Sequence, residues 1–330
     1  MAQPDLTAPI VPDPNPHSEN DPAFLTETDT ASSNQSLSSS ILNYQYENGR
    51  RYHAYREGEY ILPNDESEQE RLDLHHHISK MALGGELFRA PVDLSSGGRV
   101  LDLGTGTGIW AIEIADQFPK ATVKGTDLSP IQPQWVPPNC HFEVDDLESS
   151  WDYAHKLDFI HARNLAGGVR DYPRLYENMM ANLKPGGWVQ CVDFAVDIFT
   201  DDDTIQNAPN IKRWIDLLDE ASLKFGKRLN IAHKHKQWMI DAGFENVTEE
   251  VYKIPTNPWP KDPKMKDLGR YQLYNMLSSA EAHTWALFSR VLEWGAEEIQ
   301  VLLADLRREL KDRSIHSYEK FYYIYGRKPE

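Results

Sequence analysis

The sequence is poor in cysteine and has no long apolar run, and each shortage excludes a class of protein. Cys140 and Cys191 are its only cysteines, too few for a disulfide framework, so we expect a reducing compartment. No stretch approaches the roughly 20 apolar residues that span a bilayer. The first residues also lack the basic and apolar regions of a secretory signal. We therefore expect a cytoplasmic protein without a membrane partner, with the nucleus left open as a second compartment.

Basic residues are also scarce. Lysine and arginine number 34 against 51 acidic residues, which gives a net charge of −17. A protein that follows a phosphate backbone needs the opposite sign, so we expect no nucleic-acid partner. Apolar residues make up 40% of the chain, enough for a sizeable core.

The composition divides the chain into three parts. Residues 1–40 are rich in proline and serine, which predicts a disordered tail, with a short partner-binding motif as the alternative. Residues 41–98 contain acidic positions followed by apolar residues at helical spacing, which predicts an N-terminal helical cap. Residues 99–330 then form the main domain, in which we expect 204–315 to be a helical substrate lid that includes one strand.

Short apolar runs alternate with helical patterns in the main domain, which indicates an α/β fold with a parallel sheet. The expected strands are 100–103, 121–125, 141–144, 157–160, 188–194, 247–254 and 321–325. The expected helices are 109–118, 172–183, 211–225, 234–241, 267–277 and 280–311. Because the last strand lies near the end of the sequence, we expect it to return to the main sheet, which makes the preceding helices an insertion.

The stretch VLDLGTGTGIW, residues 100–110, is a strand that enters a glycine turn and then a helix. Glycines let the backbone approach a ligand where a Cβ atom would clash. The spacing is G-x-G-x-G, whereas a dinucleotide site prefers G-x-G-x-x-G, and Asp102 precedes the first glycine. A carboxylate there repels pyrophosphate and attracts an ammonium group, which favours S-adenosylmethionine over NAD.

Further acids follow the next two strands. Asp127 comes after the second strand, where a carboxylate accepts hydrogen bonds from both ribose hydroxyls. Asp145 and Asp146 come after the third, where we favour Asp146 as the acceptor for the adenine amino group, with Leu147 packed on the ring. The candidate cofactor-binding residues are Asp102, Gly104, Thr105, Gly106, Gly108, Asp127, Leu128, Asp145, Asp146, Leu147 and His161.

Through these residues the chain resembles class I S-adenosylmethionine-dependent methyltransferases, and most of all the fungal LaeA-like group. The matching segments are residues 55–66, the glycine loop, 125–133, 158–163 and 183–188. The resemblance implies a Rossmann-like seven-stranded sheet whose last strand is antiparallel. It also implies S-adenosylmethionine as cofactor, with contacts at Asp102, Gly104, Gly106, Asp127 and Asp146.

The resemblance leaves the substrate open, and three hypotheses follow. The first is methyl transfer to a small, hydrophobic secondary metabolite. The second is a cofactor-bound cyclase that catalyses a pericyclic reaction without methyl transfer. The third is a regulatory protein that acts through a protein partner. A homodimer is left open.

Two residues at the end of the fourth expected strand are candidates for catalysis. His161 either takes a proton from the acceptor or holds the cofactor or a loop. Arg163 either orients an acidic substrate or pairs with a carboxylate of the protein.

The remaining candidates are given structural roles. Consecutive residues on a helix point in different directions, so the histidines of residues 75–77 cannot share a metal ion, and we expect no metal site. His233 and His235 lack a ligand partner at the right spacing, and Cys191 is expected to be a buried small residue. The aromatic region 259–294 either packs in the core or lines an apolar cleft.

Overall fold

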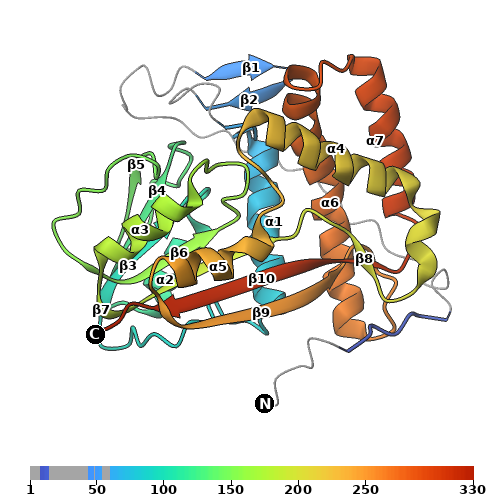
Figure 1. Cartoon of the computed structure of the whole chain (residues 1–330). Helices are drawn as coiled ribbons and strands as arrows, with labels where there is room; N and C mark the ends of the chain where they lie inside the picture. Colours follow the sequence, from blue (N-terminus) through green and yellow to red (C-terminus); the bar gives the residue numbers. More distant parts are fainter. Residues whose placement is uncertain (1–7, 15–43, 48, 54–59) are drawn as a thin grey trace.

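A mostly parallel β-sheet forms the centre of the protein (Figure 1). The structure is a computed structural model that describes residues 8–14, 44–47, 49–53 and 60–330. Its sheet strands are β3 (Gly98–Leu103), β4 (Ala121–Asp127), β5 (Cys140–Val144), β6 (Leu157–Arg163), β7 (Leu183–Phe194), β8 (Phe199–Thr200), β9 (Glu245–Pro255) and β10 (Ser317–Arg327).

The strand order confirms the predicted fold class. Strands β5, β4, β3, β6 and β7 lie side by side and are parallel. Strand β10 is antiparallel to β7, and β9 is antiparallel to β10. The two-residue strand β8, which pairs with the start of β10, is an eighth member of the sheet that the sequence did not indicate.

Seven α-helices are present in the described part of the chain. They are α1 (Glu66–Ala82), α2 (Ile109–Gln117), α3 (Tyr172–Asn182), α4 (Pro209–Phe225), α5 (His235–Asp241), α6 (Pro263–Arg290) and α7 (Ala296–Leu310), with 3-10 turns η1 (Asp203–Asn207) and η2 (Ala232–Lys234). Helices α4, α6 and α7 pack on one another at one side of the molecule, and α1 packs on α6 (Figure 1). None of these helices combines the length and the apolar composition that crossing a membrane requires.

The two faces of the sheet bury different side chains. Along β3, Val100 packs with Trp110 and other residues of α2. Leu101 and Leu103 belong to a larger cluster that reaches α3, α4, α6 and α7. Successive side chains of a strand point to opposite faces, so this alternation places apolar cover on both sides of the sheet. The carboxyl ends of the parallel strands remain as the edge at which a ligand binds.

The predicted break between two helices at residues 278–279 is wrong. Helix α6 runs without interruption through both serines, and the break falls at residues 291–295, before α7. Within α6 the Ser279 hydroxyl donates to the Met276 carbonyl, so the polar side chain is satisfied inside the helix. The chain turns instead where Glu293 adopts a left-handed φ of 59°, next to Gly295.

The N-terminal part differs from the prediction in two places. Residues 8–14, expected in a disordered tail, lie against the segment between β9 and α6, where Asp13 N donates to the Trp259 carbonyl at 2.8 Å. Residues 1–7 and 15–40 of that tail lie outside the described residues. The expected helical cap contains α1 but also a hairpin of β1 (Gln45–Glu47) and β2 (Arg50–Tyr52).

Strand β9 lies within the expected lid of residues 204–315, but it belongs to the main sheet through its pairing with β10. The helices of residues 204–315 therefore form two separate stretches, one before β9 and one after it. That division of the chain into tail, cap, domain and lid stays a prediction.

Candidate functional site

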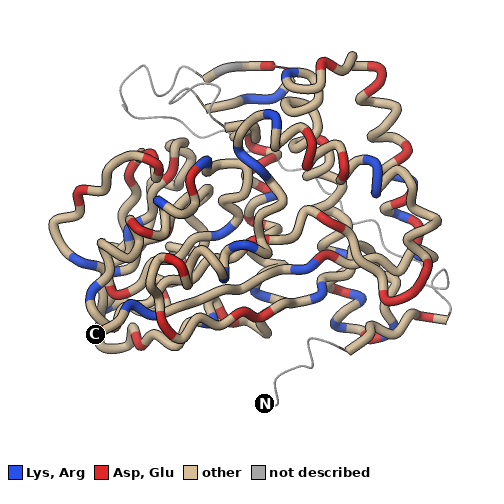
Figure 2. The backbone as a smooth tube through the Cα atoms, in the orientation of Figure 1, with Lys and Arg blue, Asp and Glu red and all other residues tan. Residues whose placement is uncertain are grey.

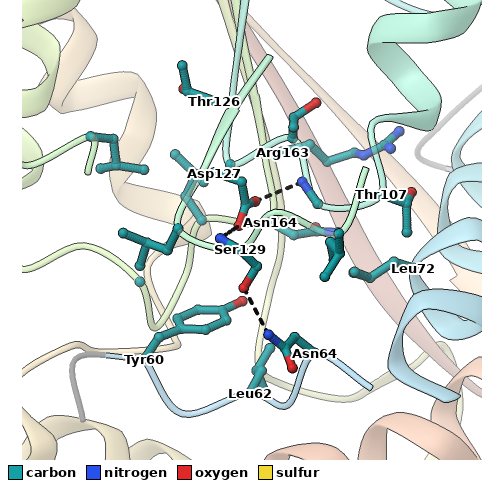
Figure 3. A pocket seen from close by; sticks show the side chains of 18 of the residues that line it. Tyr60, Leu62, Asn64, Leu72, Thr107, Thr126, Asp127, Ser129, Arg163 and Asn164 are labelled. Atoms are coloured by element: carbon teal, nitrogen blue, oxygen red, sulfur yellow. Dashed lines mark hydrogen bonds between the residues drawn. The ribbon is translucent and has the colours of Figure 1, made fainter. Parts of the chain in front are cut away.

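A cavity of about 310 Å³ lies at the carboxyl ends of β3, β4, β5 and β6. The loops after these four strands form one wall, and α1 with residues 60–64 forms the other. Figure 3 shows Tyr60, Leu62 and Asn64 on one side of Asp127 and Arg163 on the opposite side. A cavity of this size is at the lower end of the range for small-molecule sites.

The glycine loop after β3 takes up its sharp turn through left-handed residues. Gly104 has a φ of 61°, and a Cβ atom there would lie 2.5 Å from Leu165 Cδ2. Gly106 also lines the cavity, but Gly108 does not. A Cβ atom on Gly108 would lie 2.4 Å from the ring of Phe142, so this glycine lets α2 pack closely on β5, and the prediction that it contacts the cofactor is not supported by its position.

The N–H groups of this loop are already bonded to the protein. Gly106 N donates to Asp127 Oδ2 at 2.8 Å, and Thr105 N donates to the Thr126 carbonyl at 2.9 Å. A pyrophosphate-binding loop instead points such groups at the phosphate. These bonds agree with the glycine spacing and with Asp102, on which the sequence favoured S-adenosylmethionine over a dinucleotide.

Asp102 is buried at the base of the cavity and both of its oxygens have partners. Its Oδ1 accepts from His161 Nδ1 at 2.7 Å, and its Oδ2 accepts from the Thr105 hydroxyl at 2.5 Å. The His161 ring stacks on Trp110 with centroids 3.7 Å apart. Burial lowers the pKa of His161, and the bond to Asp102 opposes that shift, so the pair is a tightly fixed unit at the end of β3 and β6.

Asp127 ends β4 and faces the cavity. Besides Gly106 N, the Ser129 N–H donates to its carboxylate, at 2.9 Å (Figure 3). Burial raises its pKa from 3.8 to about 6, and the two backbone bonds offset only part of that shift. The carboxylate lines the cavity, where ribose hydroxyls of a ligand would donate further hydrogen bonds to it.

The loop after β5 brings the next predicted group to the same cavity. Asp145, Asp146 and Leu147 all line it, as does Leu128 after β4. Asp145 Oδ1 accepts from the Asp146 N–H at 2.8 Å and Asp146 Oδ1 accepts from the Glu148 N–H at 2.9 Å, so both acids stabilise the turn and the preference for Asp146 as the adenine partner stays a prediction. Of the predicted cofactor-binding residues, all except Gly108 line the cavity.

The end of β6, which carries the catalytic candidate Arg163, meets two histidines of α1 that the sequence analysis placed in structural roles. Arg163 Nη2 donates to His76 Nδ1 at 3.1 Å, and Asn164 Nδ2 donates to His75 Nδ1 at the same distance. His75, Arg163 and Asn164 line the cavity. The run of three histidines was the available signal, but only the packing of α1 against β6 shows that two of them face inward.

The sequence analysis also did not identify residues 60–64 individually as residues that line the cavity. Tyr60, Leu62 and Asn64 line the cavity, and Asn64 Nδ2 donates to the Ser129 hydroxyl at 3.2 Å, which ties this segment to the loop after β4. The signal in the sequence was the match of residues 55–66 to the resembled group, of which 55–59 lie outside the described residues.

A second, much smaller cavity of about 30 Å³ adjoins the first, and His75 lines both. Its walls come from α1, α4, α6, β7 and β10 and include Trp214, Leu218, Met276 and Phe321. The aromatic region 259–294 contributes to it through Met276, whereas Tyr271 and Tyr274 are exposed and Phe288 is buried in the core. The region therefore serves packing and cavity lining together.

The other predicted candidates lie elsewhere. His235 is buried between Asp193, 2.8 Å from its Nε2, and the Tyr176 hydroxyl, and Cys191 is buried in β7. In the part of the chain that the structure describes, no cluster of three or more His, Cys, Asp or Glu side chains has the arrangement of a metal site.

Comparison with known proteins agrees with this geometry. A family profile described as a methyltransferase domain matches residues 74–249. The methyltransferase pytC of Aspergillus terreus is 42% identical over 302 residues, which are 91% of this chain and 93% of pytC. The protein-methionine methyltransferase laeA of Emericella nidulans is 38% identical to this chain, over a region that covers 87% of this chain and 77% of laeA.

Among solved structures, the mycolic acid cyclopropane synthase CmaA1 in complex with SAH is similar over a region that covers 82% of this chain and 92% of the CmaA1 chain. Its sequence identity is 15% and its TM-score is 0.48, so the likeness adds nothing on chemistry.

Proposed function

Because this chain belongs to the class I S-adenosylmethionine-dependent methyltransferases, in their LaeA-like group, we propose that it methylates a small, largely apolar secondary metabolite. The cofactor is S-adenosylmethionine, and when bound it supplies a methyl group on a positively charged sulfur. The acceptor is the unknown part of the reaction, and the proposal concerns its size and polarity.

The residues of the cavity fit the cofactor group by group. The Asp127 carboxylate lines the cavity as an acceptor for ribose hydroxyls, and Asp146 with Leu147 offers an acceptor and an apolar surface. Gly104 and Gly106 leave room that side chains would fill. The chain's contribution to methyl transfer is then mainly to align donor and acceptor, which is worth up to roughly 7–11 kcal/mol in ideal cases.

For His161 we infer a positioning role. Its Nδ1 is bonded to Asp102 and one ring face is covered by Trp110, which supports the alternative in which it holds the base of the cavity. Burial favours the neutral imidazole, whose Nδ1 donates to Asp102, so the positioning role is inferred from this bond and the Trp110 stack and not from the protonation state.

The observation that carries the proposed acceptor class is the apolar wall next to the cofactor cavity. Trp214, Leu218, Met276 and Phe321 form the apolar part of the wall of the smaller cavity, which also includes polar side chains such as Arg71 and Asn275, and His75 lines both cavities. A substrate that reaches this wall is desolvated by hydrocarbon on several sides, which favours an apolar molecule of low mass. The name of the relative pytC supports methyl transfer as the reaction.

The proposal is tested with radiolabelled S-adenosylmethionine and an extract of fungal metabolites. We expect label in an organic-soluble product whose mass has increased by one methyl group, and no label with the Asp127→Asn variant. Label in a methionine-containing peptide and in no metabolite would contradict the proposed acceptor, and would favour the activity in the name of the relative laeA. A product of unchanged mass would favour a cyclase.

A further inference from the structure

Arg163 lines the cofactor cavity as a cation without an acidic partner. Within the described residues it takes part in no ion pair, and its hydrogen bond is the one that Nη2 donates to His76. Lys227, the other Lys or Arg side chain on the cavity wall, lies 3.5 Å from Glu148. Because a partly buried charge is costly without a counter-ion, the position of Arg163 calls for an explanation.

The acids nearest to Arg163 are committed to other groups. Asp102 is bonded to His161 and Thr105, as described above. Glu113 lies 2.6 Å from Lys80, and Asp73 accepts from the Thr107 hydroxyl at 2.6 Å. Burial lowers the pKa of the Arg163 guanidinium, and these acids only partly oppose the shift.

His76 holds the guanidinium without neutralising it. A guanidinium only donates, so His76 Nδ1 accepts and the imidazole proton is on Nε2, which faces Glu113 at 3.4 Å. Burial lowers the pKa of His76 to about 3, with the charge of Arg163 as the next cause. The interactions that run from Lys80 through Glu113 to His76 therefore orient the Arg163 guanidinium, which keeps its positive charge.

A second donor lies beside this charge. Asn164, at a left-handed φ of 57°, donates to His75 Nδ1, which leaves the proton of His75 on Nε2. That Nε2 is buried and has no hydrogen-bond partner. Since His75 and Arg163 both line the cavity, its wall here carries a positive charge and an unused N–H group.

We propose that Arg163 is the anion-binding residue of this cavity and that it binds a carboxylate. A guanidinium fork matches the two oxygens of a carboxylate. The carboxylate belongs either to the methionine part of the cofactor or to the acceptor, and in the second case the inference rests on the proposed function and adds an acidic group to the expected metabolite.

The source of the carboxylate is tested with three ligands, whose affinities for wild type and for Arg163→Gln are compared by calorimetry. S-adenosylhomocysteine carries the carboxylate, 5′-methylthioadenosine lacks it, and benzoate serves as an acidic probe on protein saturated with S-adenosylhomocysteine. If the cofactor supplies the carboxylate, Arg163→Gln lowers the affinity for S-adenosylhomocysteine about tenfold or more and leaves the affinity for 5′-methylthioadenosine unchanged. If the acceptor supplies it, S-adenosylhomocysteine is unaffected and benzoate binds wild type alone.

Thermal unfolding without ligand separates this role from a structural one. Removing an unpaired charge leaves the melting temperature of Arg163→Gln equal to or above that of wild type. Arg163→Lys keeps the charge but not the fork, so it folds and binds carboxylate more weakly than wild type. Arg308→Gln, at an exposed arginine paired with Asp305, is the control and changes neither quantity.

The proposal is overturned if Arg163→Gln and Arg163→Lys bind all three ligands as wild type does. Failure of wild type to bind S-adenosylhomocysteine at all is a different result. It would contradict the assignment of the cofactor cavity, and with it the proposed function.

Discussion

Ligand binding and protonation are coupled at Asp127. Its carboxylate accepts two backbone hydrogen bonds, yet burial holds its pKa at about 6. Ribose hydroxyls that donate to this carboxylate favour its ionised form and so lower its pKa in the complex. Binding of the adenosyl ligand then releases a proton whenever Asp127 is protonated in the free protein.

The affinity for S-adenosylhomocysteine is therefore expected to fall as the pH drops below about 6, by up to about tenfold per pH unit. Asp127→Asn should bind more weakly and without this pH dependence, because the amide does not titrate. Calorimetry in buffers of different ionisation enthalpy measures both the affinity and the released proton. An affinity that stays constant from about pH 7 to about pH 5 in wild type would contradict the role given to Asp127.

At the scale of elements, a buried carboxyl joins the last strand to α6. Glu319 on β10 is 6% exposed and accepts from Gln272 Nε2 on α6. Gln272 in turn accepts from Asn275, which also accepts from Arg71 on α1. Burial raises the pKa of Glu319 from 4.5 to about 7, so the carboxyl is protonated in the folded protein over a range in which it is ionised in the unfolded chain.

A raised pKa in the folded state means that the stabilising proton is lost as the pH rises. The contribution of Glu319 is fully present below about pH 4.5 and is gone above about pH 7. Glu319→Gln resembles the protonated form, so we expect it to match wild type near pH 4.5 and to exceed it by about 2–3 kcal/mol near pH 8. Urea unfolding at both pH values measures this, and a variant that is less stable than wild type at pH 8 would contradict the raised pKa, because it would show that the folded protein stabilises the ionised carboxylate.

For the whole molecule, the cofactor cavity lies where the N-terminal segment meets the sheet. Residues 60–64 and α1 cover the loops after β3, β4, β5 and β6, and α1 also packs on α6 (Figure 1). Figure 2 shows acidic and basic positions interspersed over the described chain, with no stripe of one sign that would suit a phosphate backbone.

A ligand that binds across this junction should stabilise both sides of it. We expect S-adenosylhomocysteine at 100 times its dissociation constant to stabilise the fold by about 2.7 kcal/mol. Hydrogen exchange should slow in residues 60–64 and α1 as well as in the loops of the sheet, and α7, which does not line the cavity, should show no added local protection. Protection confined to the sheet loops would contradict the covering role of α1.

The sequence by itself determined the elements whose cause is local. The alternation of apolar strands and helices predicted the parallel sheet and the return of the last strand to it, whereas the antiparallel direction of that strand came from the family resemblance. The glycine spacing with Asp102, Asp127 and Asp146 predicted the adenosyl site. The sheet could be predicted, and the site proposed, because strand ends, tight turns and their acidic neighbours depend on residues close in the chain.

Only the tertiary structure decided which side chains face the cavity. His75 and His76 meet Asn164 and Arg163 because α1 packs against the end of β6, almost ninety residues further along. Gly108 has the same spacing as its neighbours in the loop, but the ring of Phe142 from β5 occupies the space beside it. Such contacts depend on the burial of apolar faces that are distant in the sequence, and no local pattern records which partner each face will find.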